Sequence, residues 1–185
     1  MSVTEIKFGG FGGQGIILSG IIVGRAAAIY DDKHATLTQS FGPEARGSAC
    51  SASVVISDEP ITYPYVVKPD VLVVMSQEAY TRFGPEIKAD GVLLYEKDLV
   101  HPNDGVTAKR TAAVPATRFA EEIGRRVVLN IVMVGFFAAM TDVVRAEAVR
   151  QSVETSVPPG TEQLNLRAFD GGYSYGKGLL ADAAK

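Results

Sequence analysis

The chain has 185 residues, 46% of them hydrophobic, and a formal net charge of −3. This length and composition predict one α/β domain spanning residues 1–185, and the negative charge argues against a nucleic-acid partner, because phosphates demand a basic surface. The one cysteine, Cys50, excludes an internal disulfide and any four-cysteine zinc or iron–sulfur site, so we expect no metal site in this chain.

A membrane role is not expected either. The longest apolar stretch, Val127 to Met140, contains Asn130 and is too short to cross a bilayer. The N-terminal residues lack the basic and apolar regions of a secretory signal. We therefore expect a cytoplasmic protein without membrane contact.

The most informative segment is the glycine-rich turn Gly9-Gly10-Phe11-Gly12-Gly13-Gln14-Gly15. It follows strand-like residues 4–8 and precedes an apolar run that begins at Ile16. Residues 10, 12 and 15 fit the pattern G-x-G-x-x-G, in which glycine permits a tight turn and lets backbone N–H groups and the positive end of a helix approach a phosphate or carboxylate. The segment predicts a strand, a turn and a helix start.

Strands alternate with helices over the first two thirds of the chain. A helix over 16–30 should pack closely on a sheet at Gly20 and Gly24, and Asp31-Asp32 should close it. The alternation predicts an α/β fold with a Rossmann-like, mostly parallel sheet and one antiparallel hairpin. The other expected elements are strands at 35–41, 50–56, 71–75, 91–95 and 106–109 and a helix at 77–83, with 35–41 and 50–56 forming the hairpin.

The last third is predicted to be helical, at 115–123, 127–140, 145–153 and 161–170. Gly171-Gly172 should cap the final helix. Residues 173–185 are then expected to be a flexible tail or a segment held by a partner. Tyr173 and Tyr175 fit either an interface or a loose tail.

Three loops should meet at one edge of this sheet. If the first two strands run parallel, the glycine turn and the turn at 40–47 both leave carboxyl ends, and so does Ser76-Gln77-Glu78. Open α/β sheets bind ligands in that crevice. These loops therefore form the default site.

The ligand of the glycine turn stays open at this point. A dinucleotide would also need an acidic residue at the carboxyl end of the second strand, but Gln39 and Ser40 stand there, and Asp31 and Asp32 should lie at the opposite edge. Another anionic or CoA-like group is favoured over a dinucleotide. A turn needed only for close packing, with no ligand, is the third interpretation.

The second loop carries its own charged residues. Pro43 can start a helical turn, Glu44 suits the positive end of that turn, and Arg46 offers a planar fork for phosphate or carboxylate. An ion pair of Glu44 or Arg46 that pins the loop, or a contact of Glu44 across a subunit interface, explains these residues equally well.

The remaining reactive side chains suggest structural roles. His34 and His101 are isolated and have no partner at ligand or triad spacing. Cys50 fits a buried strand position, and Asn130, on an apolar helix, needs a hydrogen-bond partner. Since no nucleophile has an adjacent base, we expect that the chain does not catalyse a reaction alone.

Two motifs together carry a family resemblance. The run Gly10-Phe11-Gly12-Gly13-Gln14-Gly15, paired with Thr38-Gln39-Ser40-Phe41-Gly42-Pro43-Glu44-Ala45-Arg46-Gly47 and followed by 54–58 and 68–73, resembles the gamma subunit of 2-oxoacid:ferredoxin oxidoreductases. The likeness runs from about residue 4 to residue 180 and is strongest to the 2-oxoglutarate enzymes. Ser48 stands where the family usually has a second glycine after Arg46-Gly47.

The resemblance implies a multisubunit enzyme. Such complexes decarboxylate a 2-oxoacid on thiamine diphosphate with Mg²⁺, pass electrons through iron–sulfur clusters to ferredoxin and release an acyl-CoA. The gamma subunit carries none of these cofactors, and its implied partners are alpha and beta subunits and a ferredoxin-like delta subunit. The residues implied to face the shared thiamine and CoA region are Gly10, Gly12, Gly13, Gln14, Gly15, Ser40, Phe41, Gly42, Pro43, Glu44, Arg46 and Gly47.

Two rival functions remain at this stage. The first is a free-standing Rossmann oxidoreductase that binds a dinucleotide. The second is a purely structural interaction subunit. Within the family, pyruvate, branched-chain, indolepyruvate and arylglyoxylate enzymes share the motifs, so 2-oxoglutarate is favoured by overall likeness alone.

Overall fold

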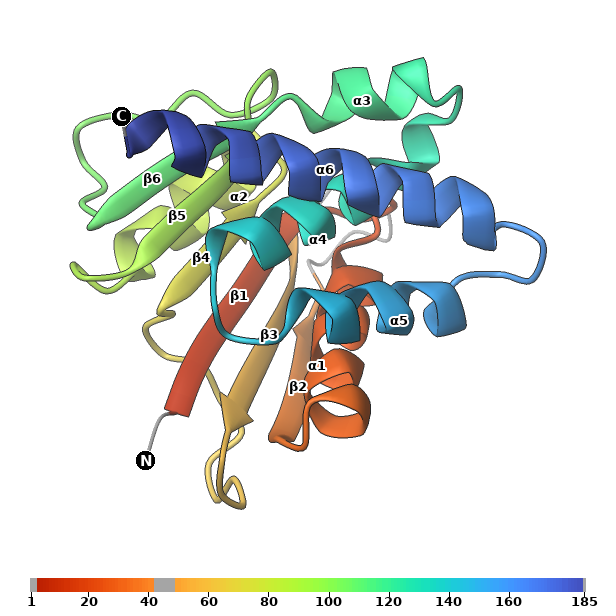
Figure 1. Cartoon of the computed structure of the whole chain (residues 1–185). Coiled ribbons are helices and arrows are strands. Elements are labelled where there is room, and N and C mark those ends of the chain that lie inside the picture. The colour runs from red at the N-terminus through yellow and green to blue at the C-terminus, as the bar shows by residue number, and fades with distance from the viewer. Residues whose placement is uncertain (1–2, 42–48, 185) are drawn as a thin grey trace.

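The computed structural model describes residues 3–41 and 49–184, and one six-stranded sheet forms its centre (Figure 1). The strand order is β2-β3-β1-β4-β5-β6. The strands are β1 (Val3–Phe11), β2 (His34–Ser40), β3 (Ala49–Ser57), β4 (Val71–Val74), β5 (Val92–Glu96) and β6 (Arg110–Val114).

The strand directions confirm the predicted mostly parallel sheet with an antiparallel hairpin. β3 runs antiparallel to both β2 and β1, between which it lies, while β4, β5 and β6 continue from β1 in parallel. β1 and β2 therefore run in the same direction. Gly9 and Ser40 both pair with Ser51, so these two strands end at one edge of the sheet.

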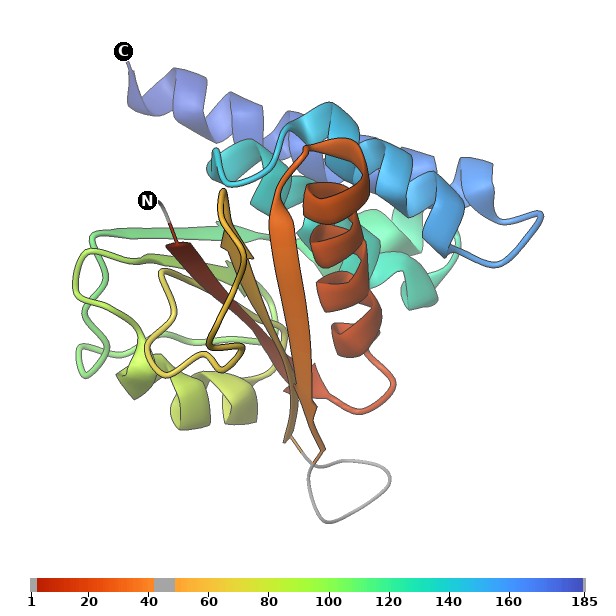
Figure 2. The same ribbon diagram turned by 90° about the horizontal axis from the view of Figure 1, so that it is seen from below.

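Helices cover both faces of the sheet. Figure 1 shows α4, α5 and α6 in front of the sheet and α2 behind it, and Figure 2 shows α1 beside β2. The helices are α1 (Ile16–Tyr30), α2 (Gln77–Phe83), α3 (Ala116–Glu122), α4 (Leu129–Met140), α5 (Ala146–Ser156) and α6 (Glu162–Ala183), with short 3₁₀ turns η1 (Gly84–Glu86) and η2 (Arg126–Val128).

The alternation of side chains along each strand creates two cores. On one face, Ile6 and Phe8 of β1 join α1 and α4, and the rings of Phe8 and Phe137 lie 5.8 Å apart. On the other face, Leu72 and Val74 of β4 pack against α2. Apolar packing on both faces explains why β4 reads as a continuous run of aliphatic residues.

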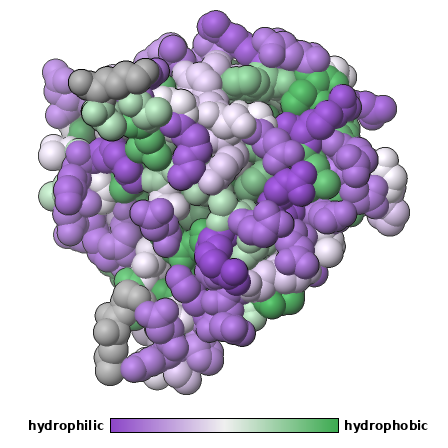
Figure 3. Space-filling model, in the orientation of Figure 1, coloured by the Kyte–Doolittle hydropathy of each residue, from purple (hydrophilic) through white to green (hydrophobic). Residues whose placement is uncertain are grey.

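The outer surface of the helical layer differs from these cores. Figure 3 shows a mainly hydrophilic face with hydrophobic residues in separate small areas. α4, in contrast, is buried along its entire length because it lies between the sheet and α6. Among the described residues, no helix combines the length and the hydropathy needed to span a bilayer.

The predicted end of the last helix at Gly171-Gly172 was wrong, because α6 continues to Ala183. A Cβ on Gly172 would lie 2.0 Å from the carbonyl oxygen of Val132, and a Cβ on Gly135 would lie 2.1 Å from that of Phe169. The glycines thus let α4 and α6 cross with their backbones in contact. They serve this crossing rather than a helix cap.

The expected tail from residue 173 is therefore helical as far as Ala183. The ring of Tyr173 stacks on Phe169 at 6.1 Å, and the ring of Tyr175 meets Phe119 edge-on at 5.6 Å. Both tyrosines contribute to packing within this chain.

Two strand predictions were also inaccurate. β1 continues through Gly9 and Gly10 to Phe11, so the turn begins later than expected. The strand expected at 106–109 lies instead at Arg110–Val114. Val106 belongs to the preceding loop and packs against Gly84, where a Cβ would lie 2.7 Å from its Cγ2.

Candidate functional site

The glycine turn forms the centre of the candidate site at the carboxyl edge of the sheet. Gly13 and Gly15 have φ angles of 95° and 75°, a region that favours glycine. A side chain on Gly15 would also collide with Asn130, whose Nδ2 donates to the Gly15 carbonyl at 3.3 Å. Both backbone conformation and α4 packing therefore require glycine here, and the predicted hydrogen bond of Asn130 is confirmed.

Gln14 fixes the turn to the neighbouring strand. Its Oε1 accepts a hydrogen bond from the Phe11 N–H at 2.7 Å, and its Nε2 donates to the Met75 carbonyl at 3.0 Å. Met75 directly follows β4, and Ser76 caps α2 by accepting from the Ala79 N–H at 3.2 Å. One amide thus joins the loops after β1 and β4, as a structural clamp.

The amino end of α1 lies directly after this turn. The N-cap residue, Gly15, has no side chain to offer, and the first turn of α1 contains no acidic residue. The first N–H groups of a helix lack acceptors within the helix and carry a partial positive charge. This end of α1 is therefore suited to an anion.

A pocket of about 340 Å³ adjoins the turn. Val127 is 72% exposed at its rim, and Arg126 forms an ion pair with Glu121 at 3.1 Å while remaining mostly exposed. The volume lies at the lower end of the range for ligand pockets, so it suits part of a ligand. The pocket is lined by Gly13, Gln14, Leu99, Thr117, Arg126, Val127 and Leu129.

A buried carboxylate supports the far wall of this pocket. Glu96, at the end of β5, has no exposed surface and accepts hydrogen bonds from the N–H groups of Asp98 at 2.7 Å, Leu99 at 2.6 Å and Thr117 at 3.0 Å. It therefore holds both the loop after β5 and the first turn of α3. Sequence reasoning missed Glu96, because its donors come from separate segments.

The structure brings together the residues predicted for the first loop. Gly10, Gly12, Gly13, Gln14 and Gly15 lie at the carboxyl edge of the sheet, which Ser40 and an exposed Phe41 also reach. The predictions for the rest of the second loop lie outside the described residues; these are Gly42, Pro43, Glu44, Arg46 and Gly47. Arg126 is the cationic residue that the sequence pattern did not assign to this edge.

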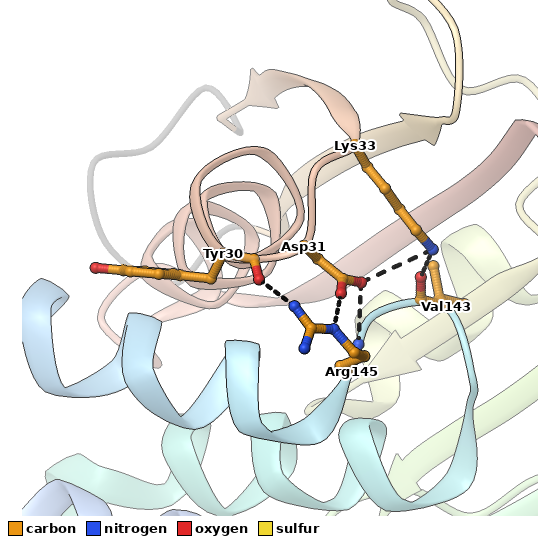
Figure 4. A network of polar contacts seen from close by, with 5 residues as sticks. All are labelled: Tyr30, Asp31, Lys33, Val143 and Arg145. Carbon is orange, nitrogen blue, oxygen red and sulfur yellow. Dashed lines mark hydrogen bonds and ion pairs between the residues drawn. The ribbon is translucent and has the colours of Figure 1, made fainter.

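Asp31 lies at the opposite end of α1, as expected, in a network drawn in Figure 4. The backbone N–H of Arg145 donates to Asp31 at 3.1 Å, its Nη2 donates to the Tyr30 carbonyl at 2.6 Å, and Lys33 donates to the Val143 carbonyl at 2.6 Å. The network ties α1 to the segment between α4 and α5. Asp31 is thus too far along the helix to bind a ribose at the glycine turn.

Cys50 and His101 do not line the pocket beside the glycine turn. Cys50 is buried in β3, and burial raises the pKa of its thiol. His101 is exposed, and its backbone N–H donates to the Oε1 of Gln77 at 2.7 Å. The described residues contain no group of three or more His, Cys, Asp or Glu side chains arranged to hold a metal ion.

Comparison with known proteins assigns the chain to a family. The model of the pyruvate ferredoxin/flavodoxin oxidoreductase family matches residues 5–175. The chain belongs to this oxidoreductase family. The predicted resemblance is thereby confirmed, and the glycine turn and its pocket lie within the matched region.

Relatives within the oxidoreductase family cover nearly the whole chain. The 2-oxoglutarate synthase subunit KorC of Methanocaldococcus jannaschii is 51% identical over 95% of both chains. That of Methanothermobacter marburgensis is 48% identical over 91% of this chain and 94% of its own. The gamma subunit of a keto/oxoacid ferredoxin oxidoreductase from Geobacter sulfurreducens has the same fold, with a TM-score of 0.86 and 39% identity over 98% of this chain and 99% of that chain.

Proposed function

We propose that this chain is the gamma subunit of a 2-oxoglutarate:ferredoxin oxidoreductase. The complex would convert 2-oxoglutarate and CoA to succinyl-CoA and CO₂, with two electrons passing to ferredoxin. The observation that carries this proposal is the identity of 51% and 48%, over more than nine tenths of the chain, to subunits named for 2-oxoglutarate.

The catalytic groups of such a complex would belong to its other subunits. An iron–sulfur cluster needs several cysteine thiolates, whereas this chain has one cysteine, which is buried. Thiamine diphosphate is bound through Mg²⁺, whose preferred ligands include carboxylates, and the described residues contain no group of three or more His, Cys, Asp or Glu side chains that could hold a metal ion. We therefore assign thiamine, Mg²⁺ and clusters to alpha, beta and delta subunits.

The role we propose for this chain is to bind and orient an anionic part of CoA at the edge of the shared site. The uncapped end of α1 would offer backbone N–H donors, and Arg126 would offer a cation next to the same pocket. Gln14 and Glu96 would keep the two walls in place. The second loop, with Arg46, would complete the site from β2.

A substrate panel tests the proposed function. The complex co-purified with this chain is assayed for CoA-dependent reduction of ferredoxin with 2-oxoglutarate, pyruvate and 2-oxoisovalerate. We expect the highest kcat/KM with 2-oxoglutarate. A complex that prefers another 2-oxoacid would overturn the substrate assignment, and purification of the chain with a bound nicotinamide or flavin would overturn the family role.

Two arginine variants test the proposed orientation of CoA. In the assembled complex, Arg126→Ala and Arg46→Ala should each raise the KM for CoA about tenfold, the effect of losing one charge-assisted hydrogen bond, with little change in the KM for 2-oxoglutarate. Arg167→Ala, on the exposed side of α6, is the matched control. Unchanged CoA kinetics in both variants, with normal assembly, would remove these loops from the CoA site.

A further inference from the structure

The edge of the sheet at β2 is open. Among the described residues, β2 pairs with β3 alone, so backbone N–H and C=O groups along its other side lack strand partners. Proteins usually protect such edges with lysine, proline or a bulge, or cover them with a helix or loop. β2, with the sequence HATLTQS, has neither of these residues, and it pairs with β3 without interruption through all seven residues.

An apolar groove of about 250 Å³ runs along this edge between β2 and α1. Gly20 and Gly24 keep α1 close to the sheet, so the groove has a floor of small residues next to Leu37. Ile29 lines the groove and is 56% exposed, so it offers an apolar contact to a bound segment. Figure 2 shows α1 and β2 side by side.

Two polar groups beside the groove also lack partners. Arg25 is exposed at the rim and forms no ion pair with any residue that the structure describes. The hydroxyl of Thr36 is buried and finds no hydrogen-bond acceptor or donor within the described part of the chain. A molecule that binds this surface would therefore form hydrogen bonds with a row of backbone groups, fill an apolar groove and pair with a cation.

We propose that the β2 edge and the α1 groove dock an extended segment of another subunit of the same complex, which joins the sheet as a seventh strand. Its backbone pairs with β2, every second side chain enters the groove beside Ile29, and a carboxylate meets Arg25. This inference rests on the proposed function, which supplies the partner subunits.

An extended polypeptide is the ligand that fits, because a row of alternating donors and acceptors at strand spacing matches another strand. A second copy of this chain fits less well. Neither α1 nor β2 contains an acidic residue, so a copy packed edge to edge would bring a second Arg25 to the interface and no carboxylate from either element. Like charges placed together in this way oppose association.

Hydrogen–deuterium exchange tests the docking directly. Exchange of residues 34–40 is measured in the isolated full-length chain and in the assembled complex. We expect the β2 amides that do not bond to β3 to exchange at least about tenfold more slowly in the complex, because their protection requires formation of a new strand pair. Equal exchange in an active complex would overturn the docking proposal while leaving the proposed function intact.

A matched pair of variants tests the groove. Ile29→Glu should lower the amount of this chain recovered with its partners by about tenfold or more, while Val67→Glu, a similarly exposed aliphatic residue on a loop, should assemble normally. Thermal unfolding of each isolated variant verifies folding. Normal assembly of Ile29→Glu, or a dimer of the isolated chain with residues 34–40 protected, would overturn the proposal. Failure of the wild-type chain to join any complex would overturn this inference and the proposed function together.

Discussion

Two adjacent glycines of α6 allow a test of its crossing with α4, because one is in close contact with α4 and the other has space around it. A Cβ on Gly172 would lie 2.0 Å from the Val132 carbonyl oxygen, whereas ordinary contact begins at 3.4 Å, so the overlap is 1.4 Å. A Cβ on Gly171 would meet its nearest neighbour, Phe119, at 3.9 Å. Alanine should therefore destabilise the chain at position 172 and be tolerated at position 171.

The expected sizes follow from two opposing effects. Overpacking costs about 1–3 kcal/mol, and a clash with backbone belongs at the upper end, while alanine within a helix gains about 1 kcal/mol over glycine. Gly172→Ala should thus lower the free energy of unfolding by about 2 kcal/mol. Gly171→Ala should raise it by about 0.5–1 kcal/mol.

Thermal and urea unfolding of the isolated chain measure both changes. For a chain of this size, 2 kcal/mol corresponds to a fall in Tm of roughly 4–8 °C, and the Gly171→Ala variant should melt slightly above wild type. If Gly172→Ala were as stable as wild type, the close contact of α4 and α6 would be refuted. Gly178→Ala, where a Cβ would have nothing within 4 Å, provides a second control.

Three further outcomes are expected. Gln14→Ala should lower the free energy of unfolding by about 1–2 kcal/mol, because two hydrogen bonds are lost. Gln14→Glu should lower it further, since a carboxylate oxygen would face the Met75 carbonyl. Urea midpoints equal to that of the wild type for both variants would contradict the clamp. Glu96→Gln should lower the free energy of unfolding by about 2–3 kcal/mol, because an amide N–H would point at a backbone donor. The control is Glu122→Gln at an exposed position, and an equally small loss of stability in both variants would argue against the role of Glu96. The isolated chain should bind thiamine diphosphate no better than a control protein in calorimetry, and stoichiometric tight binding would refute that expectation.

Local signals in the sequence were sufficient to predict much of the fold. The helix at 16–30 was predicted with its observed bounds, because an apolar run lies between a glycine turn and two aspartates. The helix at 77–83 was also predicted correctly, and Ser76 caps it through a hydrogen bond three residues away. The shared edge was expected on the condition that the first two strands run parallel, and the structure shows β1 and β2 running in the same direction.

Errors arose where tertiary contacts overrode a local signal. Gly171-Gly172 has the composition of a helix cap, yet the contact with α4 stabilises a continuing helix. Val106 looks like a strand residue, but it packs against Gly84 from a loop, and the actual edge strand β6 begins with the exposed polar residues Arg110 and Thr111. These contacts join residues more than twenty positions apart.

The candidate site was predicted only in part, because contacts between distant segments also build this site. The glycine turn follows from its sequence, but Gln14 binds the carbonyl of Met75, 61 residues away, and Glu96 binds the N–H of Thr117 in α3, 21 residues away. Arg126 follows a helix break and reaches the pocket through the fold alone. Sequence spacing gave no indication that these residues lie close together.

Omission of this chain from the complex tests the central claim most directly. The partner subunits are produced with and without it, and CoA-dependent oxidation of 2-oxoglutarate is measured in each preparation and in the isolated chain. We predict activity when all subunits are present, its loss when this chain is left out, and none for the chain alone. Full activity without the chain, or turnover by the chain by itself, would contradict the account.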